Sequence, residues 1–273
     1  MLKSKPTISA IMSNKNGLPN LVKCLNSILN QTTPFNEVLI IDDFSEDNSV
    51  RIIKNLKNKY SNLHFIEKKT KTNLVENYNF LIKKSSTDFI YFFSSSDVYN
   101  TNIVREFHKL IYKYPQASMI CGKSKINDNK VYSEKFNSRL NGSEKFLKKS
   151  DFIKLLEKSK FKFFSGGSII KRTELLKLGL LQERIKWNAD WIIYFIIALN
   201  NSIVICEKNF ATLNNNPNQY SDLRKNYYEQ SKVVINIIEY LSIFECKSFH
   251  YFKKYAILPT YEVKLFFYLI IHK

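Results

Sequence analysis

Two adjacent carboxylates, Asp42 and Asp43, end the apolar run Val38–Ile41 and are followed by a polar turn. In a parallel α/β sheet, ligands collect at the carboxyl ends of the strands. Two like charges side by side are costly unless a cation or hydrogen-bond donors face them. The pair therefore predicts a binding site at this strand end. A structural alternative stays open, in which the acids form a turn and Ser45 or Asp47 caps the next helix.

The composition is that of a large, basic, folded chain. Its 273 residues are 44% hydrophobic, enough for one large α/β domain or one domain with an appendage, and too apolar for a disordered chain. The formal net charge of +18 favours anionic partners such as phosphates, anionic lipid surfaces or nucleic acid. The abundance of Lys and Asn beside only 6 Gly is also typical of an AT-rich genome, which lessens the weight of the charge.

The cysteines and the hydropathy pattern indicate a cytoplasmic protein. Four cysteines are scattered without a C-x-x-C pair, and the short polar start, Met1–Pro6, does not read as a secretory signal. We expect reduced thiols rather than a disulfide framework. No window reaches the 18 or more uninterrupted apolar residues that a membrane span needs. The cysteines are Cys24, Cys121, Cys206 and Cys246.

Strands and helices alternate along the first hundred residues. Because residues 89–93 are wholly apolar, we expect them to form a central strand. The alternation is that of a doubly wound nucleotide-binding sheet. Apolar runs predict strands at 7–12, 38–41, 63–67 and 89–93, and helical periodicity predicts helices at 18–29, 49–60 and 73–84.

The rest of the chain is less regular. Residues 123–150 are polar and short of apolar runs, which predicts a loop or excursion. From Tyr227 onward the sequence is helical in pattern and rich in Phe, Tyr and Lys. Between these stretches we expect helices at 102–114 and 187–199 and strands at 117–121, 168–170 and 203–206.

Five segments occur in one fixed order over about two hundred residues. They are PTISAIMSNKN (Pro6–Asn16), SILNQT leading into IIDDFSEDNS (Ser27–Ser49), NFLIKKSSTDFIYF (Asn79–Phe92), FSSSDVY (Phe93–Tyr99) and WNADW (Trp187–Trp191). In these segments the chain resembles the family 2 glycosyltransferases, GT-A fold enzymes that move a sugar from a nucleotide donor to an acceptor.

The resemblance implies a fold and a domain plan. It implies an α/β GT-A fold, with a Rossmann-like and mostly parallel central sheet flanked by helices. We expect the GT-A domain at residues 1–222, with a nucleotide-binding half at about 1–122 and an acceptor half at about 123–222. Residues 223–273 are expected to form a C-terminal helical, aromatic and basic extension.

By the resemblance, the nucleotide lies over the ends of the first two strands. Asp43, with Asp42 beside it, is expected to accept the uracil N3–H. Lys15 stands where the family commonly has an aromatic ring that stacks on uracil, so part of that stacking is expected to be missing. An ordinary polar loop is the alternative for residues 13–16. The expected nucleotide-binding residues are Ser13, Asn14, Lys15, Asn16, Asp42, Asp43, Lys71, Asn73, Asn79 and Ser96.

By the same resemblance, Asp190 is the catalytic base. An inverting transferase needs a carboxylate that takes the proton of the acceptor hydroxyl while the nucleotide phosphate leaves from the opposite side. A helix N-terminus, with Trp187 and Trp191 as neighbours, would hold this carboxylate and tune its basicity. Ala189 stands where the family usually has Glu. A helix-capping Asp is the alternative.

The resemblance also places a metal-binding acidic cluster at residues 94–97, where this chain keeps only Asp97. Serine hydroxyls are poor substitutes for the anionic oxygens that Mn²⁺ or Mg²⁺ prefers. We favour weak metal dependence through Asp97, with the ion coordinated chiefly by the diphosphate and water. Two alternatives stay open: cations such as Lys15, Lys69 or Lys71 neutralise the leaving group, or catalysis is lost. At Asn214–Ser221, where relatives often carry a His ligand, this chain has no His.

Gly166 and Gly167 lie where the family places a loop that touches the donor sugar and acceptor. Glycine allows a ligand to approach the backbone closely, and a plain turn is the alternative. Trp187 and Trp191 are assigned to the same donor-sugar and acceptor site. Farther on, residues 249–273 mix aromatic side chains with Lys, which suits the surface of an anionic membrane. The alternative is a helix that packs on the domain or in a homodimer.

Three classes of function follow. The first is an inverting transferase that uses a nucleotide sugar, with UDP expected, and a glycan or lipid-linked acceptor in bacterial surface polysaccharide, lipooligosaccharide or capsule synthesis. It would be cytoplasmic, with peripheral contact at the inner face of the membrane. The second is a catalytically weak or inactive GT-A relative that binds a nucleotide or a partner, or a metal-independent transferase that uses a CMP-sugar. The third, a nucleic-acid binder, ranks last because no nucleic-acid motif is present.

Overall fold

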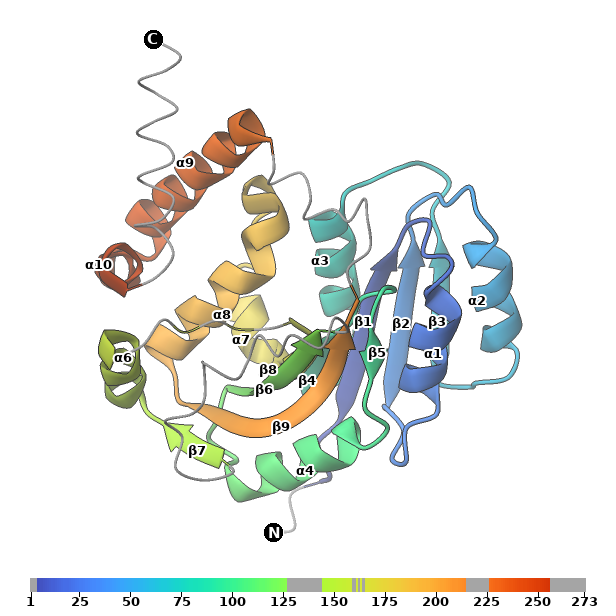
Figure 1. The fold of residues 1–273 in the computed structure, drawn as a ribbon, viewed down its shortest axis with the longest axis horizontal. Helices are drawn as coiled ribbons and strands as arrows, with labels where there is room; N and C mark the ends of the chain where they lie inside the picture. The colour runs from blue at the N-terminus through green and yellow to red at the C-terminus, as the bar shows by residue number, and fades with distance from the viewer. Residues whose placement is uncertain are drawn as a thin grey trace.

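The computed structural model describes residues 4–126, 144–158, 161, 163, 165–214 and 226–255. Strands and helices alternate in its first half, as the sequence predicts (Figure 1). In order they are β1 (Ile8–Asn14), α1 (Leu21–Leu29), β2 (Glu37–Asp42), α2 (Ser49–Lys57), β3 (Leu63–Glu67), α3 (Leu74–Lys84) and β4 (Phe89–Phe92).

The second half adds strands that lengthen the sheet and helices that cover it. Two short 3-10 segments, η1 (Ser165–Gly167) and η2 (Glu183–Asn188), precede β8 and α8. The elements are β5 (Val98–Tyr99), α4 (Ile103–Lys113), β6 (Met119–Ile126), β7 (Glu144–Leu147), α6 (Lys149–Lys158), β8 (Ser168–Lys171), α7 (Arg172–Lys177), α8 (Ala189–Asn200), β9 (Ile203–Leu213), α9 (Tyr227–Phe244) and α10 (Cys246–Tyr255).

The described strands form one nine-stranded sheet in the order β3-β2-β1-β4-β8-β6-β9-β5, with β7 paired to β9. The pairings make β1, β2, β3, β4, β6 and β9 point the same way, while β5, β7 and β8 run against them. The expected mostly parallel sheet is thus present. The strand predicted to be central, β4, does lie inside the sheet, between β1 and β8.

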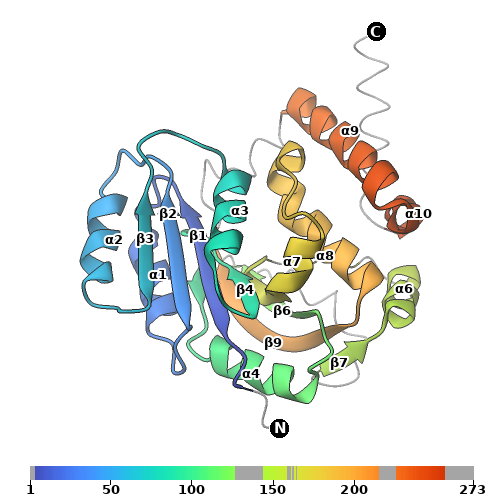
Figure 2. The same ribbon diagram turned by 180° about the vertical axis from the view of Figure 1, so that it is seen from behind.

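Helices cover both faces of the sheet, so that it divides two apolar cores (Figures 1 and 2). Along β1, Ile8, Ala10 and Met12 face the core that holds α1, α2 and α4, whereas Ile11 faces the core that holds α3, α6, α7 and α8. Side chains alternate across a strand, and a strand covered on both faces is apolar throughout. This double burial explains why the strands read as continuous apolar runs.

The expectations for the second half need three corrections. Residues 123–150 are not all loop, because β6 continues to Ile126 and β7 and the start of α6 also lie within them. The last strand extends from Ile203 to Leu213 because its outer part pairs with β5 and β6. The helix expected from residue 187 begins at Ala189, since Lys186 has φ 52° and a 3-10 segment precedes it.

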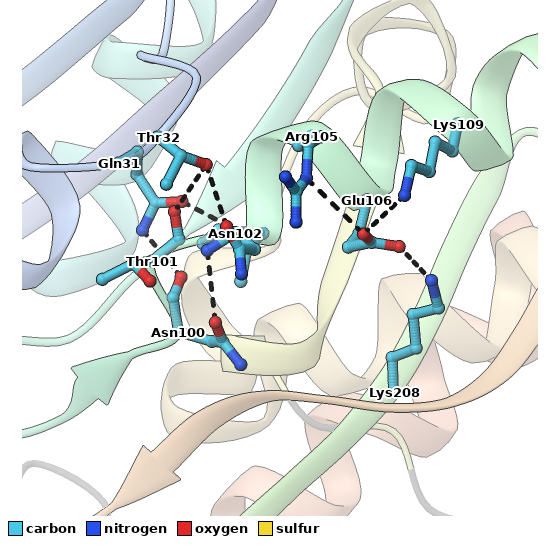
Figure 3. A network of polar contacts seen from close by, with 10 residues as sticks. Gln31, Thr32, Asn100, Thr101, Asn102, Arg105, Glu106, Lys109 and Lys208 are labelled. Atoms are coloured by element: carbon cyan, nitrogen blue, oxygen red, sulfur yellow. Dashed lines mark hydrogen bonds and ion pairs between the residues drawn. The ribbon is translucent and has the colours of Figure 1, made fainter.

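A polar network joins the end of α1 to the start of α4 (Figure 3). The Gln31 side chain donates to the Asn100 carbonyl at 2.7 Å and accepts from the Ile103 amide at 3.1 Å. Farther along α4, Glu106 forms ion pairs with Lys109 and Lys208, the latter from β9. These contacts lie on the α1 and α4 side of the sheet and have a structural role.

The C-terminal helices share the core of the larger part of the chain. Val233, Ile237, Leu241 and Phe252 are buried in the same core as α8. No helix in the described ranges is both long and apolar enough to cross a bilayer. Of the aromatic segment 249–273, the structure describes only residues up to 255, and Phe252 there is buried rather than exposed. Cys24, Cys121 and Cys206 are free buried thiols, as expected, while the Cys246 side chain lies outside the described atoms.

Candidate active site

Asp42 serves the structure of the site. It is fully buried, and its carboxylate accepts three hydrogen bonds: from Asn14 Nδ2 at 2.7 Å and from the Ser45 amide and hydroxyl at 2.8 Å each. Asp47 accepts from the Ser49 amide at the start of α2. The turn considered from the sequence therefore exists, and Asp42 holds it against the end of β1.

Asp43 has one fixed oxygen. Its Oδ1 accepts from the Thr72 amide at 2.7 Å and from Thr72 Oγ1 at 2.8 Å. The same hydroxyl lies 2.9 Å from Asn77 Oδ1, and Asn77 Nδ2 donates to Ser13 Oγ at 3.1 Å. This chain of contacts connects the ends of β1 and β2 with the start of α3. None of the described residues donates to Asp43 Oδ2, so that oxygen can accept from a ligand.

The loop after β1 is fastened to the loop after β2. Asn16, at φ 49°, donates its amide to Ser45 Oγ and accepts from the Glu46 amide, both at 2.9 Å. Asn14 is buried, whereas Lys15 and Asn16 are exposed. At Gly17 a Cβ atom would lie 2.2 Å from Asn14 Oδ1, so only glycine fits there. The structure thus brings Ser13, Asn14, Lys15, Asn16, Asp42 and Asp43 together at the ends of β1 and β2, and their role in nucleotide binding stays a prediction.

Asp97 lies past the end of β4 in a largely buried position. Its Oδ1 accepts from Ser96 Oγ at 3.0 Å and from the Asn214 amide at 3.1 Å. Burial raises the pKa of this carboxyl to about 6, although the two hydrogen bonds favour the ionised form. Asn214 Nδ2 also donates to the Ser96 carbonyl at 2.6 Å, so the end of β9 holds this segment in place.

The charges of Asp190 and Asp97 both act on one hydroxyl group, that of Tyr78. Tyr78 on α3 donates to the Phe93 carbonyl at 3.3 Å. Burial raises the pKa of Tyr78, and the negative charge of Asp190 and then that of Asp97 raise it further. Asp190 is the second residue of α8 and is half-buried. Two carboxylates that are far apart in the sequence therefore both act electrostatically on Tyr78.

Several predicted site residues make contacts within the protein. Asn73 caps α3 by accepting from the Glu76 amide at 2.8 Å. Asn79 donates to the Leu181 carbonyl and accepts from the Leu181 amide, both at 2.9 Å. Lys71 is exposed. These contacts position the helix and the chain before α8, and roles in nucleotide binding stay predictions.

Gly167 is required by packing, and Gly166 is held through its backbone. The Gly166 carbonyl accepts from the Tyr91 hydroxyl at 2.6 Å. A Cβ atom at Gly167 would lie 2.8 Å from the Gly122 carbonyl oxygen. The close approach that glycine permits is here to neighbouring strands, and contact with a sugar stays a prediction.

Trp187 and Trp191 hold the C-terminal helices. Trp187 Nε1 donates to Gln230 Oε1 on α9 at 3.1 Å. The Trp191 ring packs on Phe195 of its own helix, with centroids 4.7 Å apart, and edge-on against Phe252 of α10 at 6.3 Å. Both indoles are half-buried next to Asp190, and their predicted contact with donor sugar or acceptor is untested.

The sequence analysis missed Thr72, Asn77, Tyr78 and Asn214. Asn77 carried a usable signal, because it interrupts the apolar face that Leu74, Tyr78 and Leu81 form on α3. A buried asparagine needs hydrogen-bond partners, which it finds in Thr72 and Ser13. Asn214 carried no such signal, since its partners lie more than a hundred residues away.

The residues around Asp97 do not fit a metal ion held by the protein alone. Hard divalent cations prefer several oxygen ligands, usually with more than one carboxylate. Within the described ranges, no three His, Cys, Asp or Glu side chains gather closely enough to hold an ion. The groups that hydrogen-bond to Asp97 are the Ser96 hydroxyl and the Asn214 amide.

The chain is similar to one protein family and to solved structures. Residues 9–178 match the family described as Glycosyl transferase family 2. Among solved structures, S. aureus TarS 1–349 in complex with UDP-GlcNAc superposes with a TM-score of 0.66 and 17% identity, covering 95% of this chain and 79% of that one. TarS 1–349 in complex with UDP superposes with a TM-score of 0.64 and 19% sequence identity, covering 84% of this chain. A further structure of S. aureus TarS superposes with a TM-score of 0.64 and 18% sequence identity, covering 85% of this chain and 40% of that one.

These likenesses establish the fold, an α/β GT-A fold with C-terminal helices. This chain spans 64% of the TarS 1–349 chain solved with UDP. No curated protein matches it significantly. The family match covers residues 9–178, which is more than half of the chain and includes the ends of β1, β2 and β4, where Asp42, Asp43 and Asp97 lie. The chain therefore belongs to glycosyl transferase family 2.

Proposed function

We propose that this protein transfers a sugar from a UDP-sugar donor to a hydroxyl group of a glycan or lipid-linked acceptor, with inversion at the anomeric carbon. The observation that carries the proposal is the arrangement at the ends of β1 and β2, where hydrogen bonds from Thr72 fix one oxygen of Asp43 and leave the other to a ligand. The charges of Asp190 and Asp97 both act on Tyr78, which supports a place for these two carboxylates in the same site. Family membership and the UDP and UDP-GlcNAc complexes of TarS support the donor class.

In this proposal Asp43 reads the base. Its Oδ1 is occupied by Thr72, which leaves Oδ2 to accept the N3–H of uracil. Cytosine has no hydrogen at N3 and would place a lone pair against the carboxylate. Ser13, Asn14, Lys15 and Asn16 border the base and ribose. Lys71, Asn73, Asn79 and Ser96 are the other proposed nucleotide-binding residues, with Asn73 and Asn79 acting mainly through the backbone that they hold.

Asp190 acts as the base. Its carboxylate takes the proton of the acceptor hydroxyl as that oxygen bonds to the anomeric carbon, while the bond from this carbon to the phosphate oxygen breaks. The electron pair of the broken bond leaves with UDP. Partial burial at a helix N-terminus keeps Asp190 oriented. Gly166, Gly167, Trp187 and Trp191 are proposed to border the donor sugar and acceptor.

Charge on the leaving diphosphate must be balanced. If Mn²⁺ or Mg²⁺ accompanies the donor, Asp97 is the proposed protein ligand, and the ion would supply the positive charge. Lys15 and Lys71, which are exposed beside the site, are the proposed alternative source of that charge. The serine-rich segment 94–96 also supports a second candidate, a transferase that uses a CMP-sugar, because a monophosphate leaving group carries less charge to neutralise.

The pathway and location complete the proposal. Synthesis of a bacterial surface polysaccharide, lipooligosaccharide or capsule would suit such a transferase. We place it in the cytoplasm, with peripheral contact at the inner face of the membrane through residues 249–273. The proposal also includes a homodimer. Phe252 takes no part in membrane contact in this proposal, because it is buried.

The test is a donor hydrolysis and transfer assay with UDP-, GDP-, dTDP- and CMP-sugars, each with Mn²⁺ and with EDTA. We expect turnover with a UDP-sugar, and Asp190→Asn should lower kcat at least about a hundredfold, as is typical of a lost general base. Unchanged turnover in Asp190→Asn would remove this residue as the base. Binding of UDP without turnover of any donor would favour the inactive relative, and turnover confined to CMP-sugars would favour the second candidate.

A further inference from the structure

Phe44 is an exposed aromatic residue held in a strained backbone conformation beside Asp43. Its φ is 60°, in the left-handed region that side chains other than glycine rarely adopt. Its exposed fraction is 49%, and the described residues provide no aromatic or cation partner for its ring. A bulky residue at this position is unfavourable for the fold, and packing of the side chain does not offset the cost.

The backbone on both sides of Phe44 is fixed. The Asp43 amide donates to the Asn14 carbonyl at 2.8 Å, while Thr72 holds the Asp43 carboxylate. On the other side, the Ser45 amide and hydroxyl donate to Asp42, and Ser45 Oγ accepts from the Asn16 amide. These contacts determine the turn so fully that Phe44 must take the left-handed conformation. Strain of this kind clusters at ligand sites.

The loop after β1 offers no aromatic residue at this strand end. The loop after β1, which faces the same strand end, presents Lys15 and Asn16 to solvent. Ser13 and Asn14 are the remaining side chains there, and both are small and polar. Phe44 directly follows Asp43 in the sequence. It is therefore the aromatic residue nearest in the chain to the carboxylate that would bind the edge of a base.

We propose that Phe44 forms an aromatic wall of the nucleobase site and contributes stacking that the loop after β1 does not supply. The proposal rests on the proposed function, since it takes the ligand to be a nucleotide bound at Asp43. Stacking needs only the face of the base, so Phe44 would strengthen binding while Asp43 selects among bases.

The experiment compares Phe44→Gly, Phe44→Leu and Phe44→Tyr by calorimetric titration with UDP and with UMP, and by thermal unfolding. Phe44→Gly removes the ring and suits φ 60°, so we expect UDP affinity to fall about tenfold while the melting temperature rises by about 2 °C. Phe44→Leu keeps the apolar bulk and the backbone strain, but its affinity for UDP should also fall about tenfold because the aromatic ring is gone. Phe44→Tyr should bind as the wild type does. The affinity for UMP should fall by the same factor as the affinity for UDP, because both ligands have the same base.

Tyr112→Ala is the matched control, because Tyr112 is 57% exposed on α4, away from the strand ends. It should leave UDP affinity unchanged. If Phe44→Gly and Phe44→Leu bind UDP within twofold of the wild type, Phe44 is no wall of the site and this inference alone fails. If the wild-type protein binds none of UDP, GDP, CDP and dTDP, the proposed function fails and the inference falls with it.

Discussion

Two neighbouring residues of the same type have different roles in this site. Asp42 accepts three hydrogen bonds from the protein and is fully buried, so it maintains the turn after β2. Asp43 is held at one oxygen only. The cost of the paired charges, from which a site was predicted, is offset by donors of the protein at Asp42 and, in our proposal, by a ligand at Asp43.

Substitution by Asn separates these roles. Asp42→Asn places an NH₂ group against one of three donors, so we expect the free energy of unfolding to fall by about 2 kcal/mol. Asp43→Asn can keep the oxygen that accepts from Thr72 while its NH₂ faces the ligand, so stability should change little. UDP affinity should fall at least tenfold, and the preference for UDP over CDP should shrink, because cytosine N3 can accept from the amide. Urea unfolding and titration with UDP and CDP measure these changes, and equal effects of both variants on stability would contradict the assignment.

Asp97 makes stability depend on pH. Burial raises its pKa to about 6 from 3.8, so the folded protein binds this proton more tightly than the unfolded chain does. Its contribution to stability is therefore fully present below about pH 4 and is lost as pH rises through about 6. Asp97→Asn keeps an acceptor for Ser96 and Asn214 without the buried charge. We expect it to be more stable than the wild type by about 2 kcal/mol at pH 8, with no difference at pH 4. Denaturant unfolding at both pH values, in EDTA, tests this, and a constant difference would contradict the role of burial.

At the scale of elements, α3 organises the site. Asn77 contacts Thr72 and Ser13, and Asn79 holds the backbone of Leu181 before η2. The charges of Asp97 and Asp190 both raise the pKa of Tyr78. At the other end of the helix, Arg172 donates to the carbonyls of Ile82 and Lys83. One helix therefore links the nucleotide side of the site with the segment that leads to Asp190.

Asn79 is the sharpest test of this link. In Asn79→Ala the amide and carbonyl of Leu181, a residue that is 3% exposed, lose both partners. We expect the free energy of unfolding to fall by about 2–4 kcal/mol, and kcat to fall more than UDP affinity because the segment leads to Asp190. Asn62 provides a matched control, since it donates one bond to the Phe35 carbonyl on the other side of the sheet. Asn62→Ala should cost stability but leave kcat unchanged, and an equal loss of kcat would contradict the link.

The sequence revealed those parts of the fold that repeat with a period. The apolar runs of β1, β2 and β4 and the apolar faces of α1 and α4 are continuous, because these strands and the inner faces of these helices are buried along their length. β7 was missed because its four residues, EKFL, are all half-buried and too few to show alternation. In the site, Asp42 and Asp43 could be singled out from the sequence, because they are adjacent carboxylates at the end of an apolar run. Thr72 did not, because it meets Asp43 from 29 positions away and only the fold brings them together.

For the whole molecule, the C-terminal helices bear on the expected division into a GT-A domain at residues 1–222 and an extension at residues 223–273. The expected boundary falls outside the described residues, but α10 packs on α8 through Phe252, and α9 is joined to η2, just before α8, by the hydrogen bond from Trp187 to Gln230. Buried side chains of α9 and α10 belong to the same core as those of α8 and α3. The tryptophans on either side of Asp190 each contact one of these helices. A separable extension would not share a core in this way, so we predict that residues 226–255 fold together with the GT-A part.

Truncation after residue 225 tests this prediction. It would expose the part of the core that Val233, Ile237, Leu241 and Phe252 now complete, and each large apolar side chain contributes about 1.5–3 kcal/mol by burial. Since a whole domain is stable by only about 5–15 kcal/mol, the shortened chain should aggregate or unfold at a much lower temperature. Phe252→Ala, a milder change at a fully buried position, should lower the free energy of unfolding by about 3–5 kcal/mol. Tyr228→Ala, at an exposed position on α9, should change it by less than about 0.5 kcal/mol. If the truncated chain instead melts as the full chain does and still binds UDP, the two parts are independent, and Asp190 does not depend on the C-terminal helices for its position.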